Sequence, residues 1–146
     1  MKMIKILLTI LVFTQLSFSA ETKNEETTVE LKEGGAVVAF SKEDGFKLSK
    51  NAIANLGVTY RSVKGSGPWT LPKSALVRIK HSTGVYRKWD GWITMVLVKV
   101  LSTTSTTVTI ESVDLENQDE VAVTGVAFLR MAEADLNSDT VDACSH

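Results

Sequence analysis

The spacing of apolar side chains in the second half of the chain is typical of short β-strands. Residues 58–63 alternate between apolar or β-branched and polar side chains, which is the period-two pattern of a half-buried strand. Further strands are predicted over 74–80 and 85–89, joined by a turn at 81–84. An Asp-Gly dipeptide at 90–91, between two tryptophans, predicts a two-residue hairpin turn with positive φ.

Three more strands follow this hairpin. Residues 92–101 are apolar on both faces for much of their length, which predicts a central strand. Its expected partner is 106–113, in which Val108 and Ile110 point inward while the alternate residues face water. Residues 121–124 form another short strand.

The first half of the chain carries one helix signal. Ser49 is a suitable N-cap and Gly57 a suitable stop. Between them, three apolar residues share one face of a helix: Ala52, Ile53 and Leu56. Residues 36–40 form the first apolar run, and residues 125–134 fit neither the helical nor the strand period.

Together these elements predict a mainly β domain over residues 35–135. The expected fold is a small antiparallel β-barrel or sandwich with one short helix. Residues 20–34 are charged and threonine-rich, which predicts a flexible leader. Residues 136–146 are predicted to form a polar, flexible tail.

Residues 1–19 have the three-part pattern of a Sec-type signal peptide. Two lysines precede an apolar run, and small residues stand at Ser17 and Ser19, the two positions that a signal peptidase reads. The apolar run is too short to span a bilayer core of about 30 Å. We therefore expect the mature chain to begin at Ala20 and to be periplasmic, with no transmembrane segment after cleavage. A retained N-terminal anchor is the alternative.

The mature chain has a size and charge that suit one domain without a nucleic-acid partner. Removal of residues 1–19 leaves 127 residues with fourteen basic and seventeen acidic side chains, a net charge of −3. This balance offers no strongly basic field to attract nucleic acid. Because Cys144 is the single cysteine of the chain, no intramolecular disulfide can form.

The chemistry-bearing side chains do not form a pattern typical of an enzyme. His81 and His146 lie far apart in the sequence, one in a predicted turn and one at the terminus. Cys144 is close to the chain end, whereas a nucleophilic cysteine needs a rigid, electropositive surrounding. We assign no catalytic, cofactor-binding or metal-ligating residue, and we predict no cofactor and a non-enzymatic protein.

Three weaker features have alternative interpretations. Cys144 and His146, with Asp139 and Asp142 nearby, offer copper or zinc ligands, but a polar chain end without an ordered four-ligand site is favoured. Five basic residues near one hairpin offer either a basic patch or an ordinary solvated turn: Arg78, Lys80, His81, Arg87 and Lys88. Three tryptophans offer either an aromatic binding surface or, for the second and third, cross-strand packing: Trp69, Trp89 and Trp92.

Several segments, taken in order, resemble one protein family. They are FKLSKNAIANLGV (46–58), LPKSALV (71–77), GVY (84–86), DEVAVTG (119–125) and FLRMAE (128–133). This ordered set resembles the membrane-proximal region of periplasmic adaptor subunits, also called membrane-fusion proteins, of resistance-nodulation-division efflux pumps. The heavy-metal-efflux branch is the most similar, and the resemblance spans residues 46–134.

The resemblance implies that a large insertion is absent. In such adaptors the chain between the first two segments builds a barrel, a lipoyl-like domain and usually a helical hairpin. Here residues 64–68, Lys-Gly-Ser-Gly-Pro, replace all of it. Closing so short a loop costs little conformational entropy when the strands on both sides of it are neighbours. We therefore expect strand 58–63 to lie near a sheet edge, in the same sheet as strands after Pro72.

The function implied by the resemblance is that of an exported, non-enzymatic accessory or docking domain of an efflux-pump assembly. It would act by protein–protein contact with an inner-membrane transporter or a full-length adaptor. The copper-receiving methionines of metal-efflux adaptors have no counterpart, because Met95 and Met131 fall inside the apparent core pattern. Two alternatives stay open: a periplasmic metal carrier that uses Cys144 and His146, and a freestanding remnant domain without a pump partner.

Overall fold

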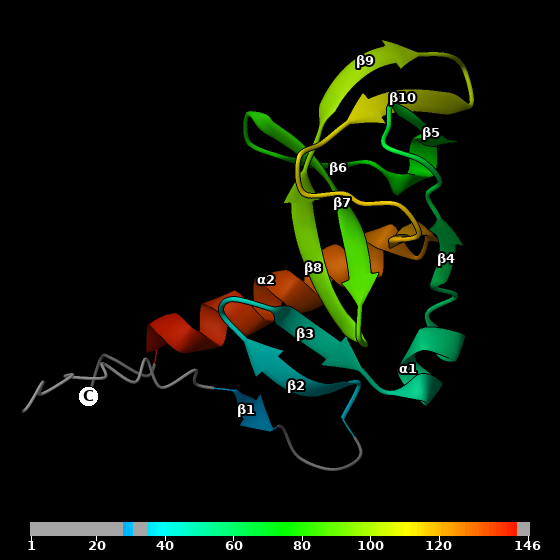
Figure 1. Ribbon diagram of the computed structural model, residues 1–146. Coiled ribbons are helices and arrows are strands. Elements are labelled where there is room, and N and C mark those ends of the chain that lie inside the picture. The colour runs from blue at the N-terminus through cyan, green and yellow to red at the C-terminus, as the bar shows by residue number, and fades with distance from the viewer. Residues whose placement is uncertain (1–27, 31–34, 143–146) are drawn as a thin grey trace, which may run out of the picture.

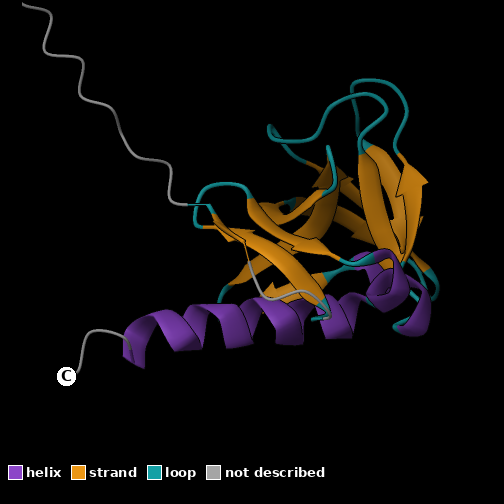
Figure 2. Ribbon diagram, turned by 90° about the horizontal axis from the view of Figure 1, so that it is seen from below, coloured by secondary structure: helices purple, strands orange, loops and turns teal. Residues whose placement is uncertain are grey.

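The computed structural model describes residues 28–30 and 35–142, which form two antiparallel sheets and two α-helices (Figure 1). The protein is mainly β, as the sequence predicted. The two sheets pack over a shared apolar core, which favours the sandwich over the barrel alternative. Figure 2 shows the longer helix lying along the larger sheet, on the side away from the smaller one.

The larger sheet contains eight strands. Seven of them follow one another in the order β1 (Val29–Glu30), β2 (Val37–Ser41), β3 (Gly45–Leu48), β8 (Trp92–Leu97), β7 (Ser82–Trp89), β11 (Glu120–Thr124) and β4 (Thr59–Ser62). The eighth, β6 (Val77–Ile79), pairs with the beginning of β7. Strand β7 is therefore bonded to three neighbours and lies at the centre of the fold.

The smaller sheet and the helices complete the structure. The smaller sheet has the order β5 (Trp69–Pro72), β10 (Thr107–Glu111) and β9 (Lys99–Thr103). The helices are α1 (Lys50–Asn55), a single 3-10 turn η1 (Lys73–Ala75) and α2 (Val126–Asp142).

Strand β7 separates two apolar cores because successive side chains of a strand point to opposite faces. Val85 belongs to the core between the two sheets, where it meets Leu71 of β5 and Ile110 of β10. Tyr86 belongs to the core between the larger sheet and α2, where it meets Leu129. All five side chains are almost fully buried, so the fold has three layers: smaller sheet, larger sheet and helix.

The Tyr86 hydroxyl group fastens α2 to the larger sheet. It donates a hydrogen bond of 2.8 Å to Oε2 of Glu133, which also accepts a hydrogen bond of 3.0 Å from Nη1 of Arg130. The ring of Tyr86 packs edge-to-face on Phe46, with centroids 6.4 Å apart. The hydroxyl group of the buried Tyr86 therefore has its hydrogen-bond acceptor on α2, the helix that covers this core.

The two tyrosines of the chain should titrate late in the native protein. Burial, with the nearby charge of Glu120, raises the pKa of Tyr60 to about 12, and burial together with Glu133 raises the pKa of Tyr86 further. Both native pKa values lie above the unfolded value of about 10. The stability they provide is complete below pH 10 and is lost as pH rises through the native pKa values. We expect native tyrosinate absorbance to appear well above pH 10, and tyrosinate formed at pH 10 before unfolding would contradict this.

The helix and the hairpin turn predicted from the sequence are confirmed. Ser49 caps α1, with its hydroxyl oxygen accepting a 3.2 Å hydrogen bond from the amide of Ala52, and Gly57 follows the helix with a φ of +62°. The turn at 90–91 has positive φ at both residues, +47° and +79°, and places Trp89 opposite Trp92.

Replacing Gly91 by valine should therefore strain the hairpin turn. A Cβ atom at this position would meet the flexible Lys47 side chain no closer than 3.8 Å, so the cost comes from the positive φ alone. We expect a loss of about 1–2 kcal/mol in the free energy of unfolding. Denaturant titration measures this loss, and an unchanged midpoint would show that the turn can adopt another conformation.

The strand predicted over 74–80 is wrong in its first half. Residues 73–75 form the turn η1, and Ser74 donates a 2.7 Å hydrogen bond to the carbonyl oxygen of Val123, which fastens this turn to β11. The hairpin between β6 and β7 turns at residues 80–81 and not at 81–84, with Lys80 at a φ of +52°. A lysine in this conformation gives no sequence signal.

The central strand predicted over 92–101 is in fact two strands in different sheets. The ladder with β7 ends where Leu97 faces Gly84, and the amide of Val98 makes one further 3.0 Å bond to Thr83. The chain then crosses to the smaller sheet as β9, which lies at its edge. The partner strand was predicted correctly, since β10 pairs with β9 and buries Val108 and Ile110.

The ambiguous segment 125–134 is the beginning of a long helix. Gly125 has a φ of +70°, and α2 follows it for 17 residues. The fold thus has a long helix in addition to the one short helix that was predicted. Because α2 ends at Asp142, residues 136–142 are helical where a loose tail was expected.

The predictions for the N-terminal region are covered only in part. The predicted signal peptide, residues 1–19, and most of the predicted leader, residues 20–34, lie outside the described residues. Within that leader, Val29 and Glu30 form β1, which pairs with Phe40 and Ala39 of β2. The larger sheet therefore begins earlier than residue 35, where the sequence placed the start of the domain.

The short joint at 64–68 is held against the loop that precedes β11. The amide of Gly65 donates a 2.8 Å hydrogen bond to Oδ1 of Asn117, and the indole of Trp69 donates a 3.1 Å bond to the carbonyl of Lys64. Strand β4, just before the joint, is an edge strand that pairs with β11. Four strands after Pro72, namely β6, β7, β8 and β11, lie in the same sheet as β4, so the predicted placement of 58–63 is confirmed.

Candidate functional site

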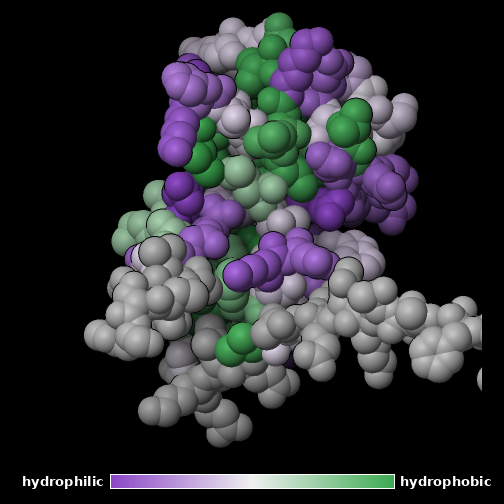
Figure 3. Space-filling model, turned by 90° about the vertical axis from the view of Figure 1, so that its left-hand side faces the viewer, coloured by the Kyte–Doolittle hydropathy of each residue, from purple (hydrophilic) through white to green (hydrophobic). Residues whose placement is uncertain are grey.

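Several large apolar side chains are exposed at the end of the molecule that holds β9 and β10. Figure 3 shows apolar side chains gathered at this upper end of one face. Two exposed residues line one groove: Leu97 at the end of β8, 54 % exposed, and Val113 in the loop after β10, 97 % exposed. Strand β9, which begins two residues after Leu97, exposes Leu101 at 44 %. Together with Val100, these residues are called the apolar end surface below.

The path of the chain explains why these apolar residues are exposed. Strand β9 has a partner on one side only, β10, and each of its five residues is exposed. Its pairing with β10 shifts register between Thr109 and Ile110, which is a β-bulge. A bulge distorts an edge strand and makes further strand pairing less favourable. The apolar end surface is therefore better suited to side-chain contact than to addition of a strand.

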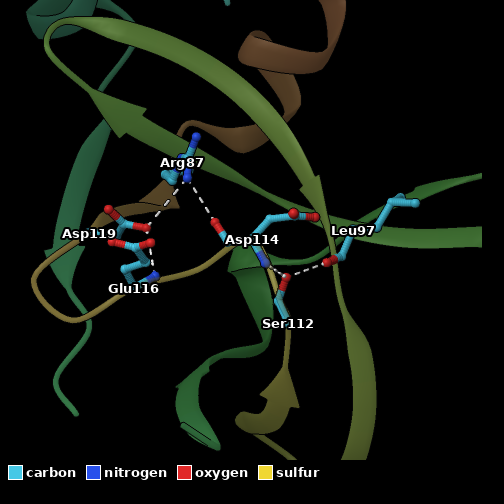
Figure 4. A network of polar contacts seen from close by, with 6 residues as sticks. All are labelled: Arg87, Leu97, Ser112, Asp114, Glu116 and Asp119. Carbon is cyan, nitrogen blue, oxygen red and sulfur yellow. Dashed lines mark hydrogen bonds and ion pairs between the residues drawn. The ribbon is translucent and has the colours of Figure 1, made fainter. Parts of the chain in front are cut away.

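Val113 is held in its exposed position by hydrogen bonds on both sides. The Ser112 hydroxyl group donates a 2.7 Å bond to the carbonyl oxygen of Leu97 and accepts a 3.2 Å bond from the amide of Asp114 (Figure 4). The loop is thus tied to the end of β8. A groove lined by Ser66 of the joint, Leu97 and Val113, among others, runs beside this tie.

Arg87 fastens the rest of the same loop to β7. Its Nη1 atom donates a 2.8 Å hydrogen bond to the carbonyl oxygen of Asp114 and lies 3.8 Å from Oδ2 of Asp119 (Figure 4). That carboxylate also accepts a 2.9 Å bond from the amide of Glu116. The Nε atom of Arg87 is buried with no partner among the described residues. The network gives residues 112–119 a defined shape beside the apolar end surface.

One ion pair borders the apolar end surface. Nζ of Lys99 lies 2.9 Å from Oε1 of Glu111, across the pair β9 and β10, and this hydrogen bond raises the pKa of Lys99. Both side chains are largely exposed, so the pair adds little stability. Polar side chains around an apolar centre are the usual arrangement of a protein interface.

The basic residues predicted near one hairpin do not gather into a patch. Arg87 bonds the loop at 112–119, and Nζ of Lys88 lies 2.8 Å from Glu120, so both are engaged at the far end of β7. Arg78, Lys80 and His81 remain exposed around the turn between β6 and β7. The structure therefore favours the solvated-turn interpretation.

The three tryptophans also fail to form one surface. Trp69 is buried in the core between the sheets, and Trp92 is half-buried with the Lys47 ammonium group 4.6 Å from its ring centre. Trp89 is 64 % exposed beside Arg87, Glu116 and Asp119. Trp89 and Trp92 do face each other across the hairpin, in the predicted register.

The candidate metal ligands at the chain end lie only partly within the described residues. Cys144 and His146 lie outside the described residues, and Asp139 and Asp142 belong to the last turns of α2. Over residues 28–30 and 35–142, no three His, Cys, Asp or Glu side chains are grouped so that they could hold a metal ion.

The apolar end surface was not foreseen from the sequence. The sequence predicts a central strand over 92–101 that is apolar on both faces, so Leu97 and Leu101 were expected to be buried. One signal was present: the run from Ser102 to Thr107 is wholly polar, so it marks the end of apolar burial on one side. Val113 stands isolated between polar residues and gave no signal.

No protein-family model, no curated protein and no solved structure matches this chain. Within the part of the chain that the structure describes, no helix is long and apolar enough to cross a membrane.

Proposed function

We propose that this protein is an exported, non-enzymatic docking domain of an efflux-pump assembly. It acts by protein–protein contact at the periplasmic face of the inner membrane, beside a resistance-nodulation-division transporter or a full-length adaptor. The observation that carries the proposal is the apolar end surface, in which Leu97, Leu101 and Val113 are exposed on a rigid framework. Contiguous exposed apolar patches mark contact sites on proteins, and Leu97 and Val113 line one groove.

The arrangement of the segments that resemble the adaptor family supports this assignment. The end of the first segment meets the fourth: the Thr124 hydroxyl donates a 2.7 Å bond to the carbonyl oxygen of Gly57 and accepts a 3.0 Å bond from the amide of Thr59. The second segment meets the fourth where Ser74 bonds Val123. Segments far apart in the sequence thus build one region of the fold, as expected for halves of a single domain separated by a removable insertion.

The joint is compatible with such a history. Strand β4 and strand β5 stand on either side of it, in different sheets that share the core. The loop at 112–119 holds the beginning of the joint, through Val63 and Gly65, and the indole of Trp69 at the other end donates a hydrogen bond back to the carbonyl oxygen of Lys64. Two chain ends held this close can be joined by a few residues at small entropic cost.

Site-specific photo-crosslinking in the cell that produces the protein tests the proposed function. The full chain carries a photoreactive side chain at position 101 or 113, and a control variant carries it at Lys42, an exposed residue of the turn between β2 and β3. We expect positions 101 and 113, and not 42, to capture a transporter or adaptor of the efflux class, identified by mass spectrometry. Capture of a different class of protein, or equal capture at position 42, would refute the proposal.

A further inference from the structure

Helix α2 has apolar residues on two opposite faces, and the fold uses one of them. The inner face packs on the larger sheet with Leu129, fully buried, and with the partly buried Leu136. The outer face presents Phe128, 46 % exposed, and Met131, 59 % exposed. A helix that covers a sheet and does nothing else normally has a polar outer face. Met131 was expected in the core, so its exposure is a correction to the sequence prediction.

The outer face has the spacing of a helix–helix seam. Ala127, Met131, Ala134 and Ser138 are all exposed and follow one another at intervals of four, three and four residues. These intervals are those of alternating d and a positions in a heptad, the positions that meet a partner helix. Small side chains at three of the four positions allow close approach, while Met131 and the neighbouring Phe128 provide larger contact areas.

The charges beside this seam select the partner and its direction. With Ala127 at position d and Met131 at position a, Arg130 is at position g. Asp135, five residues later, is at position e of the next heptad. In a parallel pair of identical helices, g of one helix lies beside the following e of the other, so Arg130 of each copy faces the second copy's Asp135. In an antiparallel pair that aligns the same seam, g meets g and e meets e, so Arg130 would lie beside the second copy's Asn137 and Asp135 beside its Phe128, with no opposite charges paired. Charge complementarity therefore favours a parallel second copy.

The Arg130 side chain is free to make this additional contact. Its Nη1 atom is bonded to Glu133, but the side chain is 38 % exposed, and a guanidinium group has five N–H donors in all. The Glu133 carboxylate is anchored by Tyr86 as well, so the guanidinium is held in place before association.

We propose that two copies of this chain associate through the outer face of α2, as a parallel pair about a two-fold axis along the helix. This inference is independent of the proposed function, because it uses α2 and not the apolar end surface. The seam covers about three helical turns, well below the area of a standard interface, so we expect a weak dimer that forms at high protein concentration.

Sedimentation of the mature chain over a series of concentrations tests the dimer. We expect a reversible monomer–dimer equilibrium, with at least a tenfold higher dissociation constant in Met131→Glu. Leu101→Glu, which places the same charge on the apolar end surface, is the matched control and should leave the equilibrium unchanged. Both side chains are exposed, and a cooperative unfolding transition checks that each variant is folded. A chain that stays monomeric throughout, or a dimer that survives Met131→Glu, would overturn the proposal.

A charge exchange tests the direction of the helices. Arg130→Asp should weaken the dimer, and the double variant Arg130→Asp with Asp135→Arg should restore it, because the pair is then re-formed with its charges reversed. This rescue separates an intermolecular role of Arg130 from its bond to Glu133, which both variants lose. If the double variant is as weak as the single one, the parallel arrangement is wrong.

Discussion

Replacing Gly125 by alanine should destabilise the protein by about 3 kcal/mol or more, since it combines backbone strain with a steric clash. Gly125 has a φ of +70°, a conformation that costs an alanine energy wherever it occurs. In addition, a Cβ atom here would lie 2.7 Å from Cγ2 and 2.9 Å from Cα of Val58, so the backbone before β4 would have to move. Chemical denaturation of the variant measures the loss.

Gly57 provides the control for this prediction. Its φ of +62° is similar, but a Cβ atom would meet no other atom within 4 Å. Gly57→Ala should therefore cost about 1 kcal/mol, from backbone strain alone. If the two alanine variants lose equal stability, close packing of Gly125 on Val58 contributes nothing, and the contact between the two halves of the domain is looser than the structure shows.

Truncating Leu71 to alanine should cost about 3 kcal/mol of unfolding free energy. Leu71 lies on β5, directly after the joint, and is 1 % exposed in the core between the two sheets. Its removal leaves a cavity in the core that also holds Val85 and Ile110, both fully buried. Thermal or chemical unfolding measures the loss.

Leu97 is the matched control, because it carries the same side chain on the apolar end surface. Leu97→Ala should change the unfolding free energy by less than about 0.5 kcal/mol, as surface substitutions usually do. A loss as large as that of Leu71→Ala would mean that the exposed leucine supports the fold, and its candidacy as a docking residue would weaken accordingly.

The parts of the fold that the sequence predicted well are those governed by local physics. The N-cap at Ser49, the glycine at 57 and the Asp-Gly turn act through bonds and dihedral angles within a few residues. Strand β10 was placed correctly because its alternation is regular and one face is buried. Local signals of this kind do not depend on where the rest of the chain lies.

The parts that were missed depend on tertiary contacts. The run at 92–101 has one continuous apolar composition, yet the chain leaves its ladder with β7 at Val98 and continues in the smaller sheet as β9. Likewise, α2 has apolar residues on both faces, so its pattern shows no clear helical period. The apolar end surface could not be predicted, because it depends on the position of β9 at the edge of the smaller sheet.

Residues on both sides of the joint form one domain. Strand β4, before the joint, completes the larger sheet beside β11, and Val63 enters the core between the sheets. Strand β3 and helix α1, also before the joint, supply Phe46, Leu48 and Ala52 to the core beneath α2. Residues 69–146 alone would leave both cores incomplete.

Equilibrium unfolding of residues 69–146, compared with that of residues 20–146, tests this claim most directly. A variant of residues 20–146 with a joint twice as long is the control, because each doubling of a flexible loop costs about 0.6 kcal/mol. We predict one cooperative transition for residues 20–146, nearly the same transition for the lengthened joint, and none for residues 69–146. A cooperative transition of residues 69–146 alone would contradict the account, since the first half would then be an appendage and not half of a domain.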